Sequence, residues 1–396
     1  MERLQTWFYK NINNTDTTFK RYLWDIINWN SRLIIIYGAR GVGKTTLMLQ
    51  YIKEKRPIDE QTVYVSLDDI YFINHTLLYF TEEFTKRGGK YLFLDEVQKY
   101  RNWSTEIKAL HDNFPDLKIV LSGSSAIELL KSEGDLSRRA LYYQLNGLSF
   151  REYLNFQHNL DYGVIKLKDI VEQALPQSLR VNEKIKPIKE FEKYVAAGYY
   201  PFFTEDITTY HKRIAQVINM VLDVDIPNSF AIDTRAVYSL KKLLAEIVEM
   251  VPFKPNIKKL SDKIGVSRDS LLKYLQLLEK ADVINMVYSQ TKGISALNKP
   301  EKIYLNNPNL AYSLNSNVNI GSLREAFFVN QLKLSHKIRY SEIGDFVIDD
   351  DYVFEIGGRN KTNKQIAGIK NSWVVADNIE IAVDNKIPLW LMGFNY

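Results

Sequence analysis

An eight-residue segment near the start of the chain has the spacing of a phosphate-binding loop. It matches the pattern G-x-x-x-x-G-K-[ST] at every defined position and consists of Gly38, Ala39, Arg40, Gly41, Val42, Gly43, Lys44 and Thr45, with Thr46 next. Glycines let the backbone turn tightly enough to aim several N–H groups at phosphate oxygens. Lys44 would reach the β- and γ-phosphates, and the Thr45 hydroxyl would ligate Mg²⁺. The segment predicts a site for ATP and magnesium.

An acidic pair supplies the groups that such a site needs for the metal and for water. Asp95 and Glu96 directly follow the apolar run Tyr91–Leu94. We expect Asp95 to hold Mg²⁺ through its water shell and Glu96 to orient or deprotonate the attacking water. An acidic pair after a strand is common by itself and is then a solvated strand end. Beside a complete phosphate-binding loop, the catalytic interpretation is favoured.

Small polar residues follow another apolar run, Lys118–Leu121. Ser122 and Ser124 each fit a polar contact to the γ-phosphate of bound ATP, and of the two Ser124 is the candidate ligand. Each hydroxyl fits equally well as the N-cap of a helix predicted over Ala126–Leu130. The residue types leave both interpretations open.

Two adjacent arginines, Arg138 and Arg139, lie just beyond these serines. An arginine here would compensate the charge that develops on the γ-phosphate during transfer, either within the subunit or from a neighbouring subunit of an oligomer. The sequence does not decide which of the two arginines has this role.

The elements that must position these residues alternate between strand and helix. Short β-rich runs, which are typical of buried strands, recur with helical stretches between them. The helix Thr45–Glu54 leaves the phosphate-binding loop, and the predicted strands are Leu33–Tyr37, Thr62–Leu67, Tyr91–Leu94 and Lys118–Leu121. This pattern predicts an α/β fold with a parallel sheet, in which loop and acidic pair follow strand ends.

At these motifs the sequence resembles a large family of prokaryotic AAA ATPases. The segments that carry the resemblance are YGARGVGKTTLMLQ, YLFLDEVQKYRNW, IVLSGSSA and LSRRALYYQLNGLSFREYL, and it continues through GSLREAFFVNQL and VFEIGGRNKTNKQI. It implies ATPase roles for Lys44, Thr45, Asp95 and Glu96, and a helical lid that opens at Leu148–Tyr153. The family often has a Gly-Arg pair where this chain has two arginines. The resemblance therefore implies ATP hydrolysis more directly than a biological role.

The middle of the chain predicts a winged helix. Helices are expected over Ser239–Val251, Asn256–Ile264 and Arg268–Lys280, and a β hairpin would follow around the Lys292-Gly293 turn. Arg268, Ser270 and Lys273 would face away from the leucines of the third helix. The stretch Lys254–Lys299 holds nine Lys and Arg against four Asp and Glu, which accounts for the whole net charge of +5. DNA is the favoured partner, and a protein partner is the alternative.

Three carboxylates in the last part of the chain resemble the order found in the restriction-endonuclease-like fold. Glu325 is expected on the helix Gly321–Leu334, Asp345 in the strand Tyr340–Ile348 and Glu355 in the next strand. Such sites have a lysine two residues after the glutamate, where this chain has Gly357, and Lys361 or Lys364 would have to replace it. We expect a retained fold without nuclease activity. Two further strands are expected over Trp373–Ala376 and Pro388–Met392.

Composition excludes several other classes of function. Cysteine is absent, so there are no disulfides and no thiolate sites, and the five histidines have no metal-ligand spacing. The N-terminal residues lack the apolar core of a signal peptide, and no apolar run is long enough for a membrane span, so a cytoplasmic protein is expected.

We therefore expect an ATPase that uses ATP and Mg²⁺ to switch or drive an attached winged-helix and nuclease-like module on DNA. The alternatives are a nucleotide-gated regulator that recruits a protein and an active ATP-gated nuclease. The expected parts are a P-loop core with an N-terminal helix (1–148), a helical lid (149–238), a winged helix (239–312) and a nuclease-like mixed α/β domain (313–396).

Overall fold

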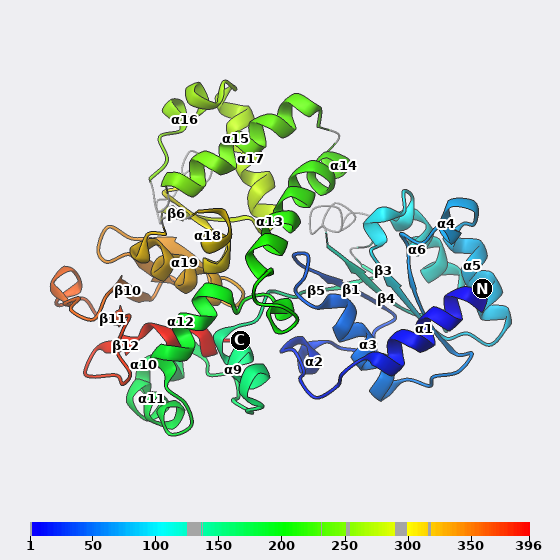
Figure 1. Ribbon diagram of the computed structural model, residues 1–396, viewed down its shortest axis with the longest axis horizontal. Coiled ribbons are helices and arrows are strands. Elements are labelled where there is room, and N and C mark those ends of the chain that lie inside the picture. Colours follow the sequence, from blue (N-terminus) through cyan, green and yellow to red (C-terminus); the bar gives the residue numbers. More distant parts are fainter. Residues whose placement is uncertain are drawn as a thin grey trace. The chain divides into compact units, whose positions relative to one another are not determined.

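A computed structural model describes residues 2–124, 136, 138–230, 232–250, 254–289, 299–315 and 318–396 of the chain. The predicted helix at 126–130 and the predicted turn at 292–293 lie outside these ranges. The chain divides into two compact units, Met1–Gly147 and Leu148–Tyr396 (Figure 1).

The N-terminal unit is built on a five-stranded parallel sheet with the strand order β2-β3-β4-β1-β5. The four predicted strands are confirmed, and a fifth joins them at one edge. The residues of this strand, LYYQ, are only partly buried, and they lack the apolar run that would predict a strand. The strands are β1 (Leu33–Tyr37), β2 (Thr62–Ser66), β3 (Tyr91–Asp95), β4 (Lys118–Gly123) and β5 (Leu141–Gln144).

Alternating side chains of these strands pack under helices. Leu33 and Ile35 of β1 join a core with Phe80 and Ile107, which come from α5 and α6. The β3 residue Phe93 contacts Tyr51 of α3. The helices of this unit are α1 (Glu2–Asn14), α2 (Leu23–Ile26), α3 (Lys44–Lys55), α4 (Tyr71–Asn74), α5 (Leu77–Lys86), the 3-10 helix η1 (Val97–Lys99) and α6 (Trp103–Asn113) (Figure 1).

The second unit begins with helices alone. Its first helix starts at a capping box, in which the Ser149 hydroxyl accepts from the Glu152 amide and the Glu152 carboxylate accepts from the Ser149 amide. Phe150, Phe191 and Phe327 then form an aromatic core. The elements are α9 (Phe150–His158), α10 (Leu167–Glu172), α11 (Ala174–Asn182), α12 (Pro187–Ala197), η2 (Pro201–Thr204), α13 (Tyr210–Met220), the π-helical η3 (Val221–Asp225) and α14 (Ile226–Phe230).

Three further helices and a hairpin follow in the order that the sequence predicts. The first begins five residues before its predicted start, at Thr234, and the third matches its predicted bounds. The Ser267 hydroxyl caps the third helix by accepting from the Ser270 amide at 3.1 Å. The elements are α15 (Thr234–Met250), α16 (Ile257–Ile264), α17 (Arg268–Lys280), the antiparallel strands β6 (Ile284–Ser289) and β7 (Lys302–Leu305), and α18 (Pro308–Leu314).

The hairpin belongs to a seven-stranded sheet, because β6 pairs in parallel with β8 and extends the order β12-β11-β10-β9-β8-β6-β7. The two predicted C-terminal domains thus share a sheet, and the four-part division of the chain stays a prediction. The remaining elements are α19 (Ile320–Leu332), β8 (Ile338–Tyr340), β9 (Phe346–Ile348), β10 (Tyr352–Gly357), η5 (Lys364–Ile366), β11 (Ser372–Ala376), β12 (Lys386–Pro388) and η6 (Leu389–Phe394).

Two predicted strands of this region are wrong. The segment Tyr340–Ile348 is two antiparallel strands with a turn between them, because Gly344 adopts φ 82°, and Asp345 lies in this turn rather than in a strand. The segment Pro388–Met392 leaves the sheet after Pro388 and becomes a 3-10 helix. All six residues of that helix are buried, so its sequence is uniformly apolar and shows no helical period.

Candidate functional site: a P-loop with an acidic pair

The phosphate-binding loop runs from the end of β1 to the start of α3. Gly41 and Gly43 have φ values of 80° and 98°, which favour glycine, and Gly43 is the N-cap of α3. Gly38 has φ 153°, and a Cβ there would lie 2.1 Å from the Leu145 carbonyl oxygen. The buried Lys44 ammonium donates to the carbonyls of Gly38 at 2.9 Å and Ala39 at 2.8 Å. The side chain of Lys44 therefore folds back over the loop that precedes it.

Asp95 lies at the end of β3 and accepts hydrogen bonds from three surrounding hydroxyls. The Thr45 hydroxyl donates at 2.5 Å and the Tyr64 hydroxyl at 2.7 Å, and the Ser122 hydroxyl donates to the other carboxylate oxygen. Burial, reinforced by the Asp95 carboxylate, raises the pKa of Tyr64 far above its usual range, so this phenol stays a donor. The two residues predicted to serve the metal, Thr45 and Asp95, are thus in direct contact.

Glu96 lies beside this group in a left-handed conformation, with φ 50°. Its carboxylate accepts from the Gln98 side-chain amide at 2.5 Å and from the Ser124 hydroxyl at 3.3 Å. The same amide donates to Ser124 at 2.8 Å. Ser124 therefore contacts the candidate base, whereas Ser122 contacts the candidate metal-binding carboxylate.

The two arginines differ in their contacts. Arg139 forms a two-point ion pair with Asp112 of α6, at 2.8 and 2.9 Å. The hydrogen bond from this guanidinium is the largest reason why the pKa of Asp112 falls to about 2. Arg138 is exposed and has no ion-pair partner within the described ranges. In this structure the ion pair of Arg139 is with α6, and the role of either arginine in phosphoryl transfer stays a prediction.

Two contacts near the loop involve residues that sequence reasoning missed. Arg21, which is 5% exposed, donates to the carbonyls of Val42 in the loop, Asn146 and Gly147. Tyr64 is an ordinary residue of a β-rich run, and nothing in its spacing indicates a contact with Asp95. Both contacts arise from the fold, which brings distant segments together, so no local pattern could have revealed them.

The three C-terminal carboxylates lie among lysines. The Lys302 ammonium, at the start of β7, contacts Glu325 at 2.8 Å and Asp345 at 3.4 Å. Asp345 also accepts from the Ile356 amide at 2.8 Å. Among the described residues, no group of three or more His, Asp and Glu side chains has an arrangement that could hold a metal ion. A lysine of the hairpin therefore links two of the predicted carboxylates, which sequence spacing did not indicate.

Lys361 lies against Gly357 and contacts one of the three carboxylates. It forms an ion pair with Glu355, whose side chain is 2% exposed. A Cβ on Gly357 would lie 2.6 to 2.7 Å from the side-chain carbons of Lys361. Burial raises the pKa of Glu355, and the Lys361 ammonium opposes this shift. Of the two lysines that could stand in for the one missing at position 357, Lys361 pairs with Glu355 and Lys364 is exposed in η5, and a nuclease role for either stays a prediction.

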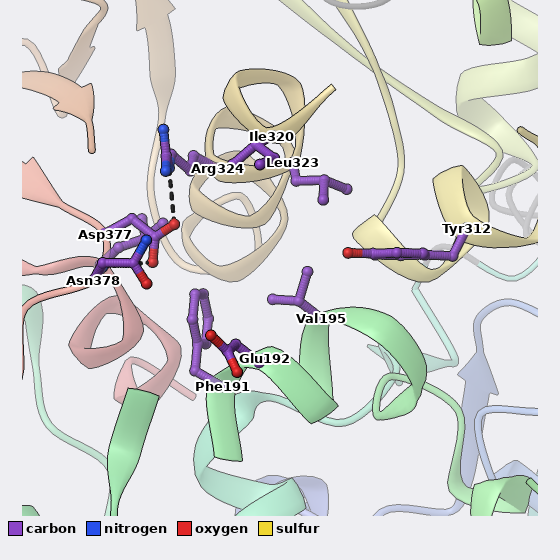
Figure 2. A pocket seen from close by; sticks show the side chains of 10 residues that line it. Phe191, Glu192, Val195, Tyr312, Ile320, Leu323, Arg324, Asp377 and Asn378 are labelled. Carbon is purple, nitrogen blue, oxygen red and sulfur yellow. Dashed lines mark hydrogen bonds and ion pairs between the residues drawn. The ribbon is translucent and has the colours of Figure 1, made fainter. Parts of the chain in front are cut away.

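A hollow of about 180 Å³ opens elsewhere in the second unit, between α12, α18 and α19 (Figure 2). Phe191, Val195 and Leu323 give it apolar walls. On one side Arg324 donates to Asp377 at 2.8 Å, which is the dashed contact in Figure 2. Both charges of this wall are thus already paired.

A second hollow, of about 490 Å³, lies where α17 begins. It is lined by Arg235 near the start of α15, by Ser267 and Ser270 at the start of α17, and by Lys273 one turn further along α17. Arg235 and Lys273 are both exposed. The two cations, the hydroxyls and the helix N-terminus favour an anion at this surface, and one lining carboxylate, Asp233, opposes it.

No helix within the described ranges is both long enough and apolar enough to cross a bilayer.

Comparison with known proteins supports the assignment of the first unit. Residues 30–154 match a family model described as an AAA domain, and residues 188–322 match a domain of unknown function, DUF8612. Uncharacterized protein MJ1637 of Methanocaldococcus jannaschii is 27% identical over 72% of this chain. The match covers 64% of that relative, so this chain spans less than two thirds of its length. Uncharacterized protein MJ1544 of the same organism is 24% identical over 92% of this chain and 89% of its own.

Solved structures give weaker similarities. AMPPCP-bound DnaA from Aquifex aeolicus has 14% identity and a TM-score of 0.28, over 70% of this chain and 88% of DnaA. The Aeropyrum pernix ORC1 protein in complex with DNA has 11% identity and a TM-score of 0.31, over 78% and 90%. Both scores are below 0.5, and nothing about this chain follows from them. The family match over residues 30–154, the parallel sheet and the loop geometry together support an AAA-type P-loop fold for the N-terminal unit.

Proposed function

We propose that this protein binds ATP with Mg²⁺ and hydrolyses it. The observation that carries the proposal is the direct contact of Thr45 with Asp95, beside Lys44 of the loop and Glu96 of the same strand end. The Thr45 hydroxyl and the Asp95 carboxylate lie side by side, and both are oxygen ligands of the kind that Mg²⁺ prefers. Water and phosphate would supply the remaining ligands. The residues present therefore fit the cation.

Different groups of the chain bind the phosphates and activate the attacking water. The backbone amides of the loop and the N-terminus of α3 bind the phosphates, and the Lys44 ammonium exchanges its two carbonyl partners for phosphate oxygens. Mg²⁺, which Thr45 and Asp95 would hold, would compensate the negative charge of the phosphates. Glu96 orients the attacking water and accepts its proton, and Ser124 lies against this carboxylate.

Removal of the lysine charge tests the binding half of the proposal. Lys44→Ala should abolish ATP binding in calorimetry and phosphate release in a steady-state assay, because the ammonium contacts phosphate in the ground state. Lys55→Ala, an exposed lysine at the end of the same helix, is the matched control and should behave as the parent. Equal ATP affinity for Lys44→Ala and the parent would refute the proposal.

The hollow at the start of α17 favours a second activity, DNA binding by the winged-helix region. Arg268 and Lys273 are exposed on the helix whose N-terminus borders the hollow. Each phosphate contact should contribute about 0.9 to the slope of log affinity against log salt. We propose that ATP turnover switches or drives this module and the nuclease-like region on DNA, so that DNA stimulates phosphate release.

Charge reversal tests this second activity. The variant Arg268→Glu with Lys273→Glu should bind duplex DNA of any sequence more weakly and with a smaller salt slope. Lys168→Glu with Arg180→Glu, on two other helices of the same unit, is the control for net charge. If the reversed variant binds DNA as tightly as the parent at every salt concentration, the region is a protein-docking module, as in a nucleotide-gated regulator.

A further inference from the structure

The side chain of Gln98 bridges the candidate base and the serine beside it. Its amide nitrogen lies 2.5 Å from a Glu96 carboxylate oxygen and 2.8 Å from the Ser124 hydroxyl. These two contacts fix the orientation of the amide, because the reverse orientation would place its carbonyl oxygen against the carboxylate. Gln98 therefore holds Glu96 through an N–H donor, in a hydrogen bond strengthened by the carboxylate charge.

The backbone conformation of Glu96 has to be stabilised by surrounding contacts. A glutamate with φ 50° is in a sparsely populated conformation that persists only where surrounding contacts fix it. Its amide donates to the Asp95 carboxylate at 2.9 Å, so a shift of this peptide would disturb the candidate metal-binding group as well. The contact from Gln98 fixes the other end of the residue, the carboxylate that must face water.

The oxygen of the Gln98 amide is the second feature of this side chain. Gln98 Oε1 is buried, and among the described residues no donor reaches it. A buried acceptor without a partner is unfavourable and calls for an explanation. The hydrogen bond that the nitrogen of the same amide donates to the Glu96 carboxylate is strengthened by the carboxylate charge and offsets this cost.

We propose that Gln98 is a positioning residue that holds the Glu96 carboxylate in place for attack by water. This inference rests on the proposed ATPase function and deepens it. Gln98→Ala should lower kcat by about tenfold or more, within the range for loss of general-base alignment, and should leave ATP affinity within twofold of the parent. Lys99→Ala, the exposed neighbour in η1, is the control and should keep the parental kcat.

A cycle with Glu96→Gln separates positioning from a general structural effect. If Gln98 acts through Glu96, Gln98→Ala should lower kcat by less than twofold in the Glu96→Gln background, because the base is already lost. A tenfold loss in both backgrounds would overturn the proposal. An unchanged or higher kcat for Gln98→Ala alone would also overturn it, and a higher value would make the contact inhibitory.

A second measurement does not require hydrolysis. Gln98→Ala should raise the equilibrium constant for unfolding by about tenfold in the parent, as for a hydrogen bond to a charged group, and by less than twofold in a Glu96→Ala background. Equal effects in both backgrounds would show that the contact is absent and would overturn the inference. If the parent hydrolyses no ATP, the ATPase proposal fails first, which the parental assay alone reveals.

Discussion

Replacement of Arg21 by methionine should destabilise the N-terminal unit strongly. Methionine keeps most of the apolar stem but removes the guanidinium that donates to Val42, Asn146 and Gly147. The side chain is buried, so water cannot fully replace these donors. At about 1 kcal/mol for each carbonyl that loses its donor, Arg21→Met should lower the free energy of unfolding by about 3 kcal/mol.

The same substitution should weaken ATP binding, because Val42 belongs to the phosphate-binding loop. If about 1.4 kcal/mol of the loss reaches the loop, ATP affinity falls about tenfold. Urea unfolding followed by tryptophan fluorescence would give the stability, and calorimetry would give the affinity. Arg3→Met is the control, since Arg3 is an exposed residue whose ion pair with Asp69 should contribute less than about 1 kcal/mol. Equal small losses for both variants would refute the assigned role of Arg21.

Three further predictions follow from particular contacts. Gly38→Ala should lower ATP affinity more than about tenfold by calorimetry, because its Cβ would lie 2.1 Å from the Leu145 carbonyl oxygen, whereas Gly163→Ala, whose Cβ meets nothing within 4 Å, should bind as the parent. Gly357→Ala should destabilise the second unit by about 1–3 kcal/mol in urea unfolding and by less in a Lys361→Gly background, because the three atoms nearest to the added Cβ are side-chain carbons of Lys361, its Cβ included; equal losses in both would contradict this. Supercoiled DNA should stay uncut with Mg²⁺ or Mn²⁺ and ATP, because Lys302 and Lys361 already pair with the three carboxylates, and cleavage that disappears in Asp345→Ala would show the opposite.

Much of the N-terminal unit could be predicted because its signals are local. The loop motif fixes glycines at set positions, and the runs around Leu33–Tyr37 and Tyr91–Leu94 are short and apolar, as buried parallel strands are. The acidic pair could be predicted because it comes directly after the apolar run of β3. Strand β5 was missed because an edge strand is only half-buried and its residues carry no apolar run.

The contacts that complete the site could not be predicted, because they join segments far apart in the chain. Tyr64 reaches Asp95 from the neighbouring strand, and Arg21 reaches residues 146 and 147 across more than 120 positions. Lys302 reaches two of the C-terminal carboxylates from the hairpin, which no spacing indicated, whereas Lys361, which pairs with Glu355, is one of the two lysines that the sequence offered. Periodicity assigns elements, whereas such partners depend on the register between them.

The most direct test of the account is the separation of ATP binding from hydrolysis at Glu96. Glu96→Gln should bind ATP with Mg²⁺ as tightly as the parent in calorimetry and should release phosphate at least about a hundredfold more slowly, because only the proton acceptor is lost. Glu60→Gln, an exposed glutamate outside the site, should match the parent in both assays. Near-parental phosphate release by Glu96→Gln would contradict the account, since water would then be activated by another group.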